Sequence, residues 1–297
     1  MELKLLRSFV VLSEELHFGR AAKRLFIVQP ALTAQIHALE RELGVRLFDR
    51  SRHRVELSEA GRSFLAGAVA TLEQAERAVD LVRASDRGEV GRIRLGFVSS
   101  VLPWYLPALV RRLHRRYPRI ELDLKDMSTP DQVRALKEGE IDFGFARLPI
   151  DTTGLVVHHL FTEPFRAAVP SDHPWAEREA LTARDFAGRP CFVLDRRFAP
   201  GFHDELLLAF ARQGVALEIE RAFGEFTTMA ALVGAGLGVG LVPHLALVVP
   251  PPGVVLLPID LGDHLSRIGL AGRRLETALA RTFQTVAVDT AGDPDGV

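Results

Sequence analysis

The chain is poor in several residue types, and each shortage excludes a class of protein. Its 297 residues include one cysteine, Cys191, so an internal disulfide is impossible and a reducing cytoplasm is the expected compartment. No apolar run reaches the length that spans a membrane, and the segment after Met1 lacks the apolar core of a signal peptide. The formal net charge is -1, so any contact with nucleic acid has to be local. We therefore expect a cytoplasmic protein that does not engage a membrane.

Sequence patterns of catalysis and metal binding are also missing. His158 and His159 are adjacent, so on a strand they would point to opposite faces, and no Cys/His spacing resembles a zinc site. The glycine run from Gly234 to Gly240 follows a helical segment and leads into a strand, whereas a dinucleotide-binding fingerprint follows a strand and opens a helix. No Ser/His/Asp order and no pair of carboxylates stands out. We therefore expect neither an enzyme nor a bound cofactor or metal.

What the chain does contain begins with three helical patterns, the first over roughly residues 2 to 15. Pro30 suits the first turn of the third helix, and Gly44 suits its end. The buried stripe of this helix would be Leu32, Ile36, Leu39 and Leu43, and its polar face would carry Gln29, Thr33, Ala34, His37 and Arg41. A third helix with polar residues near its N-terminus is typical of the recognition helix of a helix-turn-helix, which reads base edges in the major groove.

The next segment, residues 45 to 57, alternates apolar and polar residues and is rich in arginine. Val45, Leu47, Val55 and Leu57 are expected to point inward, which leaves the arginines for solvent or phosphate. A solvated helix followed by an ordinary basic hairpin is the alternative interpretation, but the two features in this order favour a DNA-binding wing. The residues expected to contact DNA are Gln29, Pro30, Thr33, Ala34, His37, Arg50, Arg52 and Arg54.

Residues 1–60 resemble the winged helix-turn-helix of the LysR-type transcriptional regulators. The shared motifs are AAxxL at 21–25, QPALTxQIxxLE at 29–40, LGVxLFxR at 43–50 and LSxAG at 57–61. The wording LHFGRAA at 16–22 resembles the branch of the family that controls aromatic and chloroaromatic catabolism. Two positions depart from the pattern: Val28 stands where Ser or Thr usually caps the helix, and Ala34 stands where Arg or Lys is common.

A proline-free segment from Ser58 to about Ala84 predicts one long helix with Ser58 as its N-cap. Apolar residues step along it by three and four, as at the a and d positions of a heptad, and they are Leu65, Ala68, Leu72, Ala75, Val79 and Val82. This stripe predicts pairing with a second helix, and packing on its own domain is the alternative. The family resemblance implies the linker helix through which such regulators dimerise, followed by a hinge at 86–91.

Beyond residue 91, strand-like runs alternate with helical patterns, which indicates open parallel sheets flanked by helices. The expected strands are Ile93–Val98, Ile120–Leu124, Ile141–Ala146, Phe165–Val169, Cys191–Leu194 and Val239–Val242. The resemblance implies two α/β lobes of the periplasmic-binding-protein type II fold, with crossings near 161–164 and 265–268. The expected domains are a winged helix-turn-helix at 1–58, a linker helix and hinge at 59–88, and an effector-binding domain at 89–297, with lobe I at about 92–161 and 268–297 and lobe II at about 162–267.

Ligands of such sheets bind beyond the carboxyl ends of the strands, where helix N-termini offer N–H groups. Hydroxyls stand at two of the predicted strand ends and an arginine at a third. A serine or threonine before a helix is also an ordinary N-cap, but the three ends converge and the family uses these positions for an effector. The expected site is Ser99, Ser100, Ser128, Thr129 and Arg147, with Phe202, His203, Phe226 and Thr227 as weaker candidates for the opposite wall. Because these polar groups can all donate, the expected effector is a small carboxylate, such as an aromatic acid or a muconate-like product.

These features together predict a sequence-specific DNA-binding transcription regulator that a small-molecule effector controls. The expected partners are double-stranded DNA with an inverted-repeat promoter site, the effector, further copies in a homodimer or homotetramer, and RNA polymerase if the chain is an activator. A solute-binding protein of the same two-lobed fold is the alternative. The missing signal peptide and the N-terminal helix-turn-helix argue against it.

Overall fold

The computed structural model describes residues 1–51, 54–274 and 277–292. The chain divides into two compact units, Met1–Ala84 and a second unit that begins at Ser85. None of the helices in the described ranges is long and apolar enough to cross a membrane.

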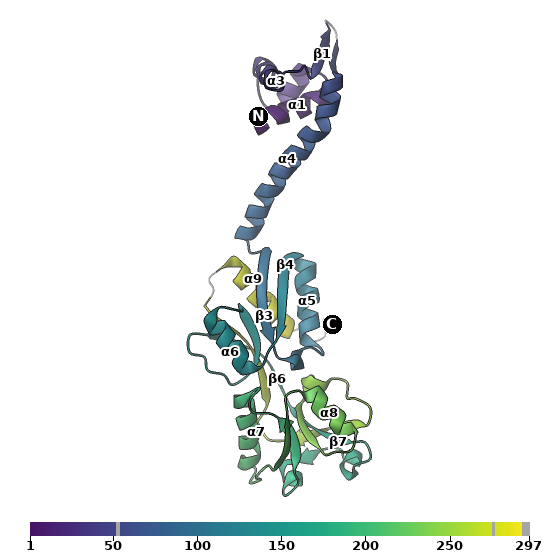
Figure 1. Ribbon diagram of the computed structural model, residues 1–297, viewed down its shortest axis with the longest axis vertical. Coiled ribbons are helices and arrows are strands. Elements are labelled where there is room, and N and C mark those ends of the chain that lie inside the picture. Colours follow the sequence, from purple (N-terminus) through teal and green to yellow (C-terminus); the bar gives the residue numbers. More distant parts are fainter. Residues whose placement is uncertain (52–53, 275–276, 293–297) are drawn as a thin grey trace. The chain divides into compact units, whose positions relative to one another are not determined.

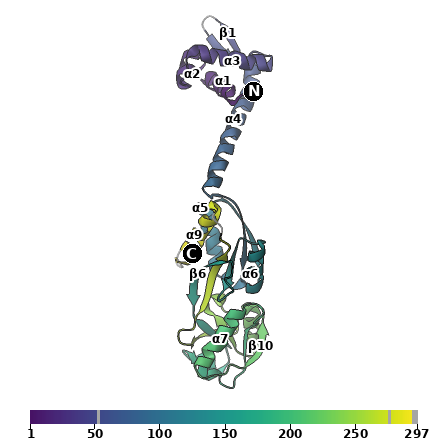
Figure 2. The ribbon, with the colours of Figure 1, turned by 90° about the vertical axis from the view of Figure 1, so that its left-hand side faces the viewer.

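The first unit gathers three short helices, then a hairpin and a long helix (Figures 1 and 2). Its elements are α1 (Leu3–Glu15), α2 (Phe18–Arg24), α3 (Gln29–Leu43), β1 (Phe48–Ser51), β2 (Arg54–Leu57) and α4 (Glu59–Asp86). The predicted helices are confirmed. Pro30 lies in the first turn of α3, and Gly44 ends that helix with a φ of +71°, a left-handed conformation that glycine adopts without strain.

Side-chain hydrogen bonds fasten the hairpin to the helices on both of its sides. The Glu40 carboxylate in α3 accepts from the backbone N–H groups of Leu47 and Phe48 at 2.9 and 3.3 Å. Ser58 caps α4 as predicted, because its hydroxyl oxygen accepts from the Gly61 N–H at 2.9 Å. The hairpin is antiparallel, and Phe48 pairs with Leu57.

The structure corrects the interpretation of the apolar stripe on α4. Ala68 is 1% exposed within the core of the first unit, and Leu65 and Leu72 pack against that same core. The stripe is therefore not one continuous pairing seam: its first half covers the helix-turn-helix. The prediction of pairing with a second helix is wrong for Ala68, because its side chain is already buried in the core of its own unit. Leu65 and Leu72 are half-buried, and their pairing stays a prediction. Further along α4, Ala75 is half-buried, while Val79 and Val82 are 48% and 70% exposed.

The second unit contains two mixed sheets, each packed against helices. The first sheet has the strand order β4-β3-β5-β13-β6. Its strands are β3 (Val90–Phe97), β4 (Arg119–Asp126), β5 (Phe143–Arg147), β6 (Val156–Glu163) and β13 (Ser266–Gly272), and its helices are η1 (Ser99–Val101), α5 (Tyr105–Arg116), α6 (Thr129–Glu138) and α9 (Ala278–Ala291). Helices α5 and α9 pack on one face and α6 packs on the other (Figure 1).

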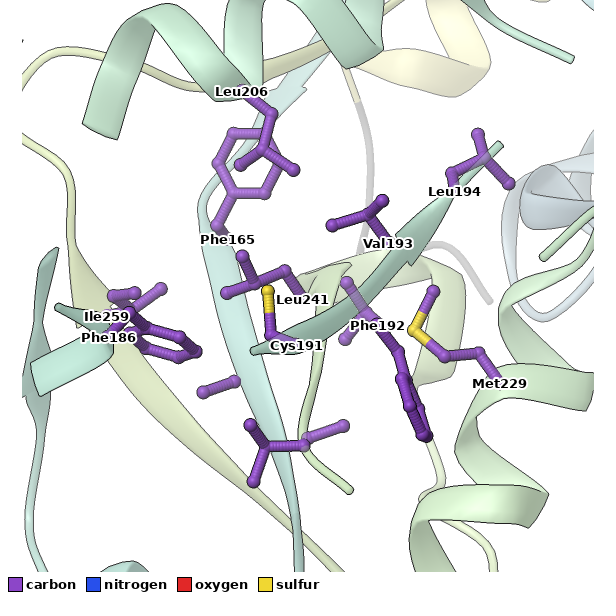
Figure 3. Close-up of a cluster of buried hydrophobic side chains, with 14 of the residues drawn as sticks. Phe165, Phe186, Cys191, Phe192, Val193, Leu194, Leu206, Met229, Leu241 and Ile259 are labelled. Carbon is purple, nitrogen blue, oxygen red and sulfur yellow. The ribbon is translucent and has the colours of Figure 1, made fainter. Parts of the chain in front are cut away.

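The second sheet has the order β10-β9-β11-β7-β12-β8. Its strands are β7 (Phe165–Pro170), β8 (Leu181–Thr182), β9 (Cys191–Leu194), β10 (Ile219–Phe223), β11 (Gly240–Pro243) and β12 (Val254–Asp260), and its helices are η2 (Pro174–Glu177), η3 (Ala183–Phe186), α7 (Pro200–Arg212), α8 (Phe226–Gly234) and η4 (His244–Leu247). Its core contains Cys191, Phe165 and Phe192 together with Leu206 of α7 and Met229 of α8 (Figure 3).

The two-lobed fold is confirmed, but the expectation of parallel sheets is wrong. Strands β3, β4 and β5 are parallel, whereas β13 runs antiparallel to β5 and β6, and β7 runs antiparallel to β11 and β12. The chain leaves the first sheet at Pro164, between β6 and β7, and returns at β13. A strand that follows such a crossing, β7 or β13, enters its new sheet in the direction opposite to its neighbours.

Candidate DNA-reading surface and effector pocket

The N-terminal half of α3 presents a polar surface. Gln29, Pro30, Ala34 and His37 are exposed, while Leu32, Ile36 and Leu39 on the opposite side are buried. Thr33 is half-buried, and its hydroxyl donates to the Gln29 carbonyl oxygen at 3.1 Å. The sequence therefore predicted correctly which face of this helix is available, although Thr33 is less accessible than expected.

The turn before α3 carries an apolar residue in an unusual conformation. Phe26 has a φ of +57°, and its side chain is 95% exposed. Val28, the residue that departs from the family pattern, is also exposed and makes no side-chain cap. The first backbone N–H groups of α3 therefore lack the hydroxyl acceptor that Ser or Thr would supply.

Beside α3 and the turn that follows it lies an open hollow of about 720 Å³. It is lined by Ala34, His37, Glu40, Arg41, Gly44, Val45 and Arg46. Val45 was expected to point inward but is 47% exposed, because the chain turns outward at Gly44 before Leu47 enters the core. Of the predicted wing arginines, Arg54 forms an ion pair with Glu56 at 2.8 Å, Arg50 belongs to β1, and Arg52 lies outside the described residues.

The three strand ends that the sequence singled out meet at one cavity of about 330 Å³. Five of the predicted effector residues line it: Ser99, Ser100, Ser128, Arg147 and Phe226. The remaining lining residues are Val98, Asp126, Met127, Leu194, Phe198, Ala199, Gly224 and Glu225. The cavity thus combines the carboxyl ends of β3, β4 and β5 with loops that belong to the second sheet.

Arg147 is 2% exposed, and its guanidinium is enclosed by partners. One terminal nitrogen donates to Glu163 at 3.3 Å and to Ser266, and the other donates to Ser100 at 2.6 Å. The group also lies over the rings of Phe202 and Phe226, at 4.8 and 5.4 Å from their centroids. Burial lowers the pKa of Arg147, and the Glu163 carboxylate opposes that shift. The positive charge predicted here is present, but a buried carboxylate compensates it.

The hydroxyls of Ser99 and Ser128 form hydrogen bonds with carboxylates of the protein. Ser99 donates to the Glu225 carboxylate, which joins the first sheet to the start of α8. Ser128 caps α6 by accepting from the Asp131 N–H at 3.2 Å, and it donates to the Asp131 carboxylate at 2.6 Å. Ser128 is therefore the N-cap that the alternative interpretation described, and it lines the cavity as well.

Four predicted residues do not line the cavity. Thr129 is buried, and its hydroxyl oxygen accepts from the Arg147 backbone N–H at 3.3 Å. Phe202 is buried in the first turn of α7, where its ring stacks on Phe165 at 5.5 Å. His203 follows it and bonds the Leu194 carbonyl oxygen through Nδ1 at 2.9 Å. Thr227 is exposed on α8. The backbone thus directs these side chains into the core or into solvent.

Two acidic residues of the cavity were not anticipated. Asp126 ends β4, and partial burial raises the pKa of its carboxyl. Glu225 immediately precedes α8 and comes from the second sheet's side of the cavity. The sequence pointed to its neighbour Phe226, but not to the hydrogen bond between Glu225 and Ser99, which lie 126 positions apart. Within the described ranges, no three His, Cys, Asp or Glu side chains gather to hold a metal ion.

Comparisons with known proteins agree with this arrangement. Residues 3–62 match the family model "Bacterial regulatory helix-turn-helix protein, lysR family", and residues 86–291 match "LysR substrate binding domain". The HTH-type transcriptional regulator CatR of Pseudomonas putida is 39% identical over 243 residues, which are 82% of this chain and 83% of CatR.

Solved structures of full-length regulators are similar as well. The crystal structure of CbnR, a LysR family transcriptional regulator, matches 97% of this chain and 100% of its own with a TM-score of 0.88 and 28% identity. Full-length CbnR complexed with its target DNA matches 98% of this chain and 100% of its own with a TM-score of 0.83 and 28% identity.

Proposed function

Because the chain belongs to the LysR family of bacterial transcription regulators, we propose that it controls a promoter as a homo-oligomer and that a small organic acid sets its activity. Members of this family bind DNA and carry an effector-binding domain, and they are not enzymes. The proposed functional divisions are 1–58 for DNA binding, 59–88 for pairing and the hinge, and 89–297 for the effector. Its place of work is the cytoplasm, where promoter DNA is accessible.

In the proposed DNA complex, α3 lies in the major groove. Gln29 and Thr33 read base edges, supported by contacts from Pro30, Ala34 and His37, while Arg50, Arg52 and Arg54 hold phosphates. The exposed N-terminal turn of α3 supports this assignment. Arg41 and Arg46, which line the hollow beside α3, are basic residues placed to join the phosphate contacts.

We assign pairing to the second half of α4, where Val79 and Val82 expose apolar surface that the first unit does not cover. Ala75 completes this shorter seam. A two-fold pair of reading helices implies an inverted-repeat operator, and the family resemblance extends the dimer to a tetramer. RNA polymerase is a further partner if the regulator activates transcription.

The cavity at the ends of β3, β4 and β5 is the observation that carries the effector proposal. It brings together polar side chains from three strand ends and a compensated Arg147–Glu163 pair, in a volume suited to a small molecule. The Ser100 hydroxyl, whose oxygen already accepts from Arg147, keeps its hydrogen for an acceptor such as a carboxylate oxygen. The sequence resemblance to regulators of aromatic catabolism makes small aromatic acids the first compounds to examine.

The decisive experiment is a DNA-binding titration with the full-length protein. Fluorescence anisotropy with the DNA upstream of its own gene should show tighter binding than a scrambled fragment of equal length, and footprinting should reveal an inverted repeat. A panel of small carboxylates should include one that changes the footprint. Equal affinity for the genomic and scrambled fragments, together with ligand binding, would instead support a solute-binding protein.

A further inference from the structure

The hydroxyl groups of the proposed effector cavity have largely committed their hydrogens. An ionised carboxylate can only accept, so Ser99 must donate its hydrogen to Glu225. By the same reasoning, Ser128 donates to Asp131 at 2.6 Å. These two hydroxyls therefore offer a ligand lone pairs, and they do not act as the donors that their residue type suggests.

The positive charge of Arg147 is also largely neutralised by its partners. Its terminal nitrogens donate to Glu163, Ser266 and Ser100, and two phenylalanine rings cover its faces. Glu163 balances its charge at 3.3 Å, and both side chains are 2% exposed. Breaking this pair to bind a ligand would leave a buried carboxylate alone, which is costly. The Arg147–Glu163 pair therefore adds no net charge to the cavity.

The side-chain acceptors of the cavity are less committed than its side-chain donors. Glu225 receives the Ser99 hydrogen on one carboxylate oxygen, and within the described ranges its other oxygen makes no hydrogen bond. Asp126 lines the same cavity without a hydrogen-bonded or ion-paired side chain from the described residues. With Arg147 balanced, these two carboxylates supply negative charge and uncommitted side-chain acceptors, beside the backbone N–H groups at the starts of η1 and α8, which no side chain caps.

We propose that this cavity selects a small acid that also carries a hydrogen-bond donor, an ammonium or hydroxyl group, which binds Glu225 while the acid group binds Ser100. The inference rests on the proposed function, because it assigns ligand chemistry to the proposed effector cavity. An acid without a donor would bring negative charge toward Glu225 and Asp126 and leave their free oxygens without a hydrogen bond. A donor on the ligand makes a charge-assisted hydrogen bond there instead.

The same contact connects ligand binding to the arrangement of the lobes. Ser99 belongs to η1, after β3 of the first sheet, whereas Glu225 precedes α8 on the second sheet. A ligand donor at Glu225 shares or replaces the Ser99 hydrogen bond, which is one of the direct links between the sheets. Ligands with and without a donor therefore act differently on this link.

Calorimetry with the full-length protein tests the inference through matched ligand pairs. The probes are benzoate against 3-hydroxybenzoate, and 3-phenylpropanoate against phenylalanine, in which the second member adds a donor to the same skeleton. We expect a donor-bearing member to bind at least about tenfold more tightly than its partner, as a charge-assisted hydrogen bond implies. Glu225→Gln should shrink that ratio most for the ammonium ligand, because the amide keeps the size of the side chain and removes the charge.

Glu220→Gln is the matched control, because Glu220 is an exposed carboxylate on β10 outside the cavity, and its ratios should equal those of the wild type. Tighter binding by the donor-free members, or a ratio that Glu225→Gln leaves unchanged, would overturn the inference. Promoter binding measured on the same samples separates the two proposals. If the protein binds its promoter specifically and responds to donor-free acids, the proposed function stands and the role proposed for Glu225 is wrong. If it shows no preference for promoter DNA, the proposed function itself is wrong.

Discussion

Thr129 shows how a residue at the right place can serve the fold and not the ligand. Its buried hydroxyl oxygen accepts from the Arg147 N–H at 3.3 Å, while its own N–H donates to the Phe198 carbonyl oxygen at 3.0 Å. Thr129→Val keeps the shape and leaves the Arg147 N–H unsatisfied. We expect it to lower the free energy of unfolding by about 1–3 kcal/mol in urea denaturation. Thr228→Val, at an exposed position on α8, is the control and should change stability by much less.

Phe26 is a residue whose conformation costs stability. A non-glycine residue in the left-handed region is strained, and Asn tolerates that region better than Phe. Because Phe26 is 95% exposed at a φ of +57°, Phe26→Asn removes little packing and should raise the free energy of unfolding by about 1 kcal/mol. Phe26→Leu keeps the strain, so urea denaturation should show no gain for it. A gain of equal size in both variants would contradict backbone strain as the source of the cost.

At the scale of whole elements, the two halves of α4 have different surroundings, although the same apolar pattern runs through both. Its first half closes the core of the first unit, and its second half exposes Val79 and Val82. Val79→Glu together with Val82→Glu should therefore separate the oligomer while the circular-dichroism spectrum stays unchanged, because charges placed in an apolar seam oppose pairing. Sedimentation velocity measures the mass.

The control for this pair is Gln74→Glu with Leu81→Glu, which adds two carboxylates to the same helix outside the seam. Both positions are exposed. We expect the control to keep the wild-type mass. If the seam variant also keeps that mass, pairing does not use the second half of α4.

Strands were predicted correctly where burial in a sheet leaves an apolar pattern in the sequence. The six expected strands are segments of apolar residues, some continuous and some interrupted by a charged residue, and all six occur in the sheets. Five strands of the described ranges were not predicted. Strands β6, β8 and β10 lie in the sheets' edge positions, and exposed polar residues interrupt the apolar pattern of β6 and β10. Strands β12 and β13 lie inside their sheets and were missed as well. Strand direction in β7 and β13 depends on how the chain crosses between the sheets, and no local residue encodes it.

At the scale of the whole molecule, DNA binding should separate into a part that reads sequence and a part that does not. Gln29→Ala should relax preference at one base position by about 1–3 kcal/mol, measured across single-base variants of the operator. Arg54→Ala should weaken binding to all sequences alike and lower the slope of log affinity against log salt by about one. Arg77→Ala on α4, where Arg77 pairs with Glu73 at 2.9 Å, is the charge-matched control and should leave both quantities unchanged. Discrimination by Gln29→Ala equal to the wild type would contradict this orientation of α3.

The proposed effector cavity was located from the sequence mainly through one sheet, and Phe226 was the one residue of the opposite wall predicted correctly to line it. The carboxyl ends of parallel strands share an edge, so Ser99, Ser128 and Arg147 could be placed together from their positions alone. Glu225 and Phe198 reach the cavity from the other sheet, and only tertiary structure brings them there. The direction of each hydroxyl hydrogen could not be predicted either, because it depends on which carboxylate lies opposite.

Cys191 makes the chain convenient for distance measurements. It is the single cysteine of the sequence, it is packed in the core of the second sheet (Figure 3), and burial raises its thiol pKa to about 12. At neutral pH it therefore holds almost no thiolate, the form that reacts with maleimides. A cysteine introduced at an exposed site such as Leu237 in the second unit, and another at Lys23 in the first, would be the ones that take up fluorophores. Energy transfer between the two dyes could then follow the separation of the units in solution, with the native cysteine left in place.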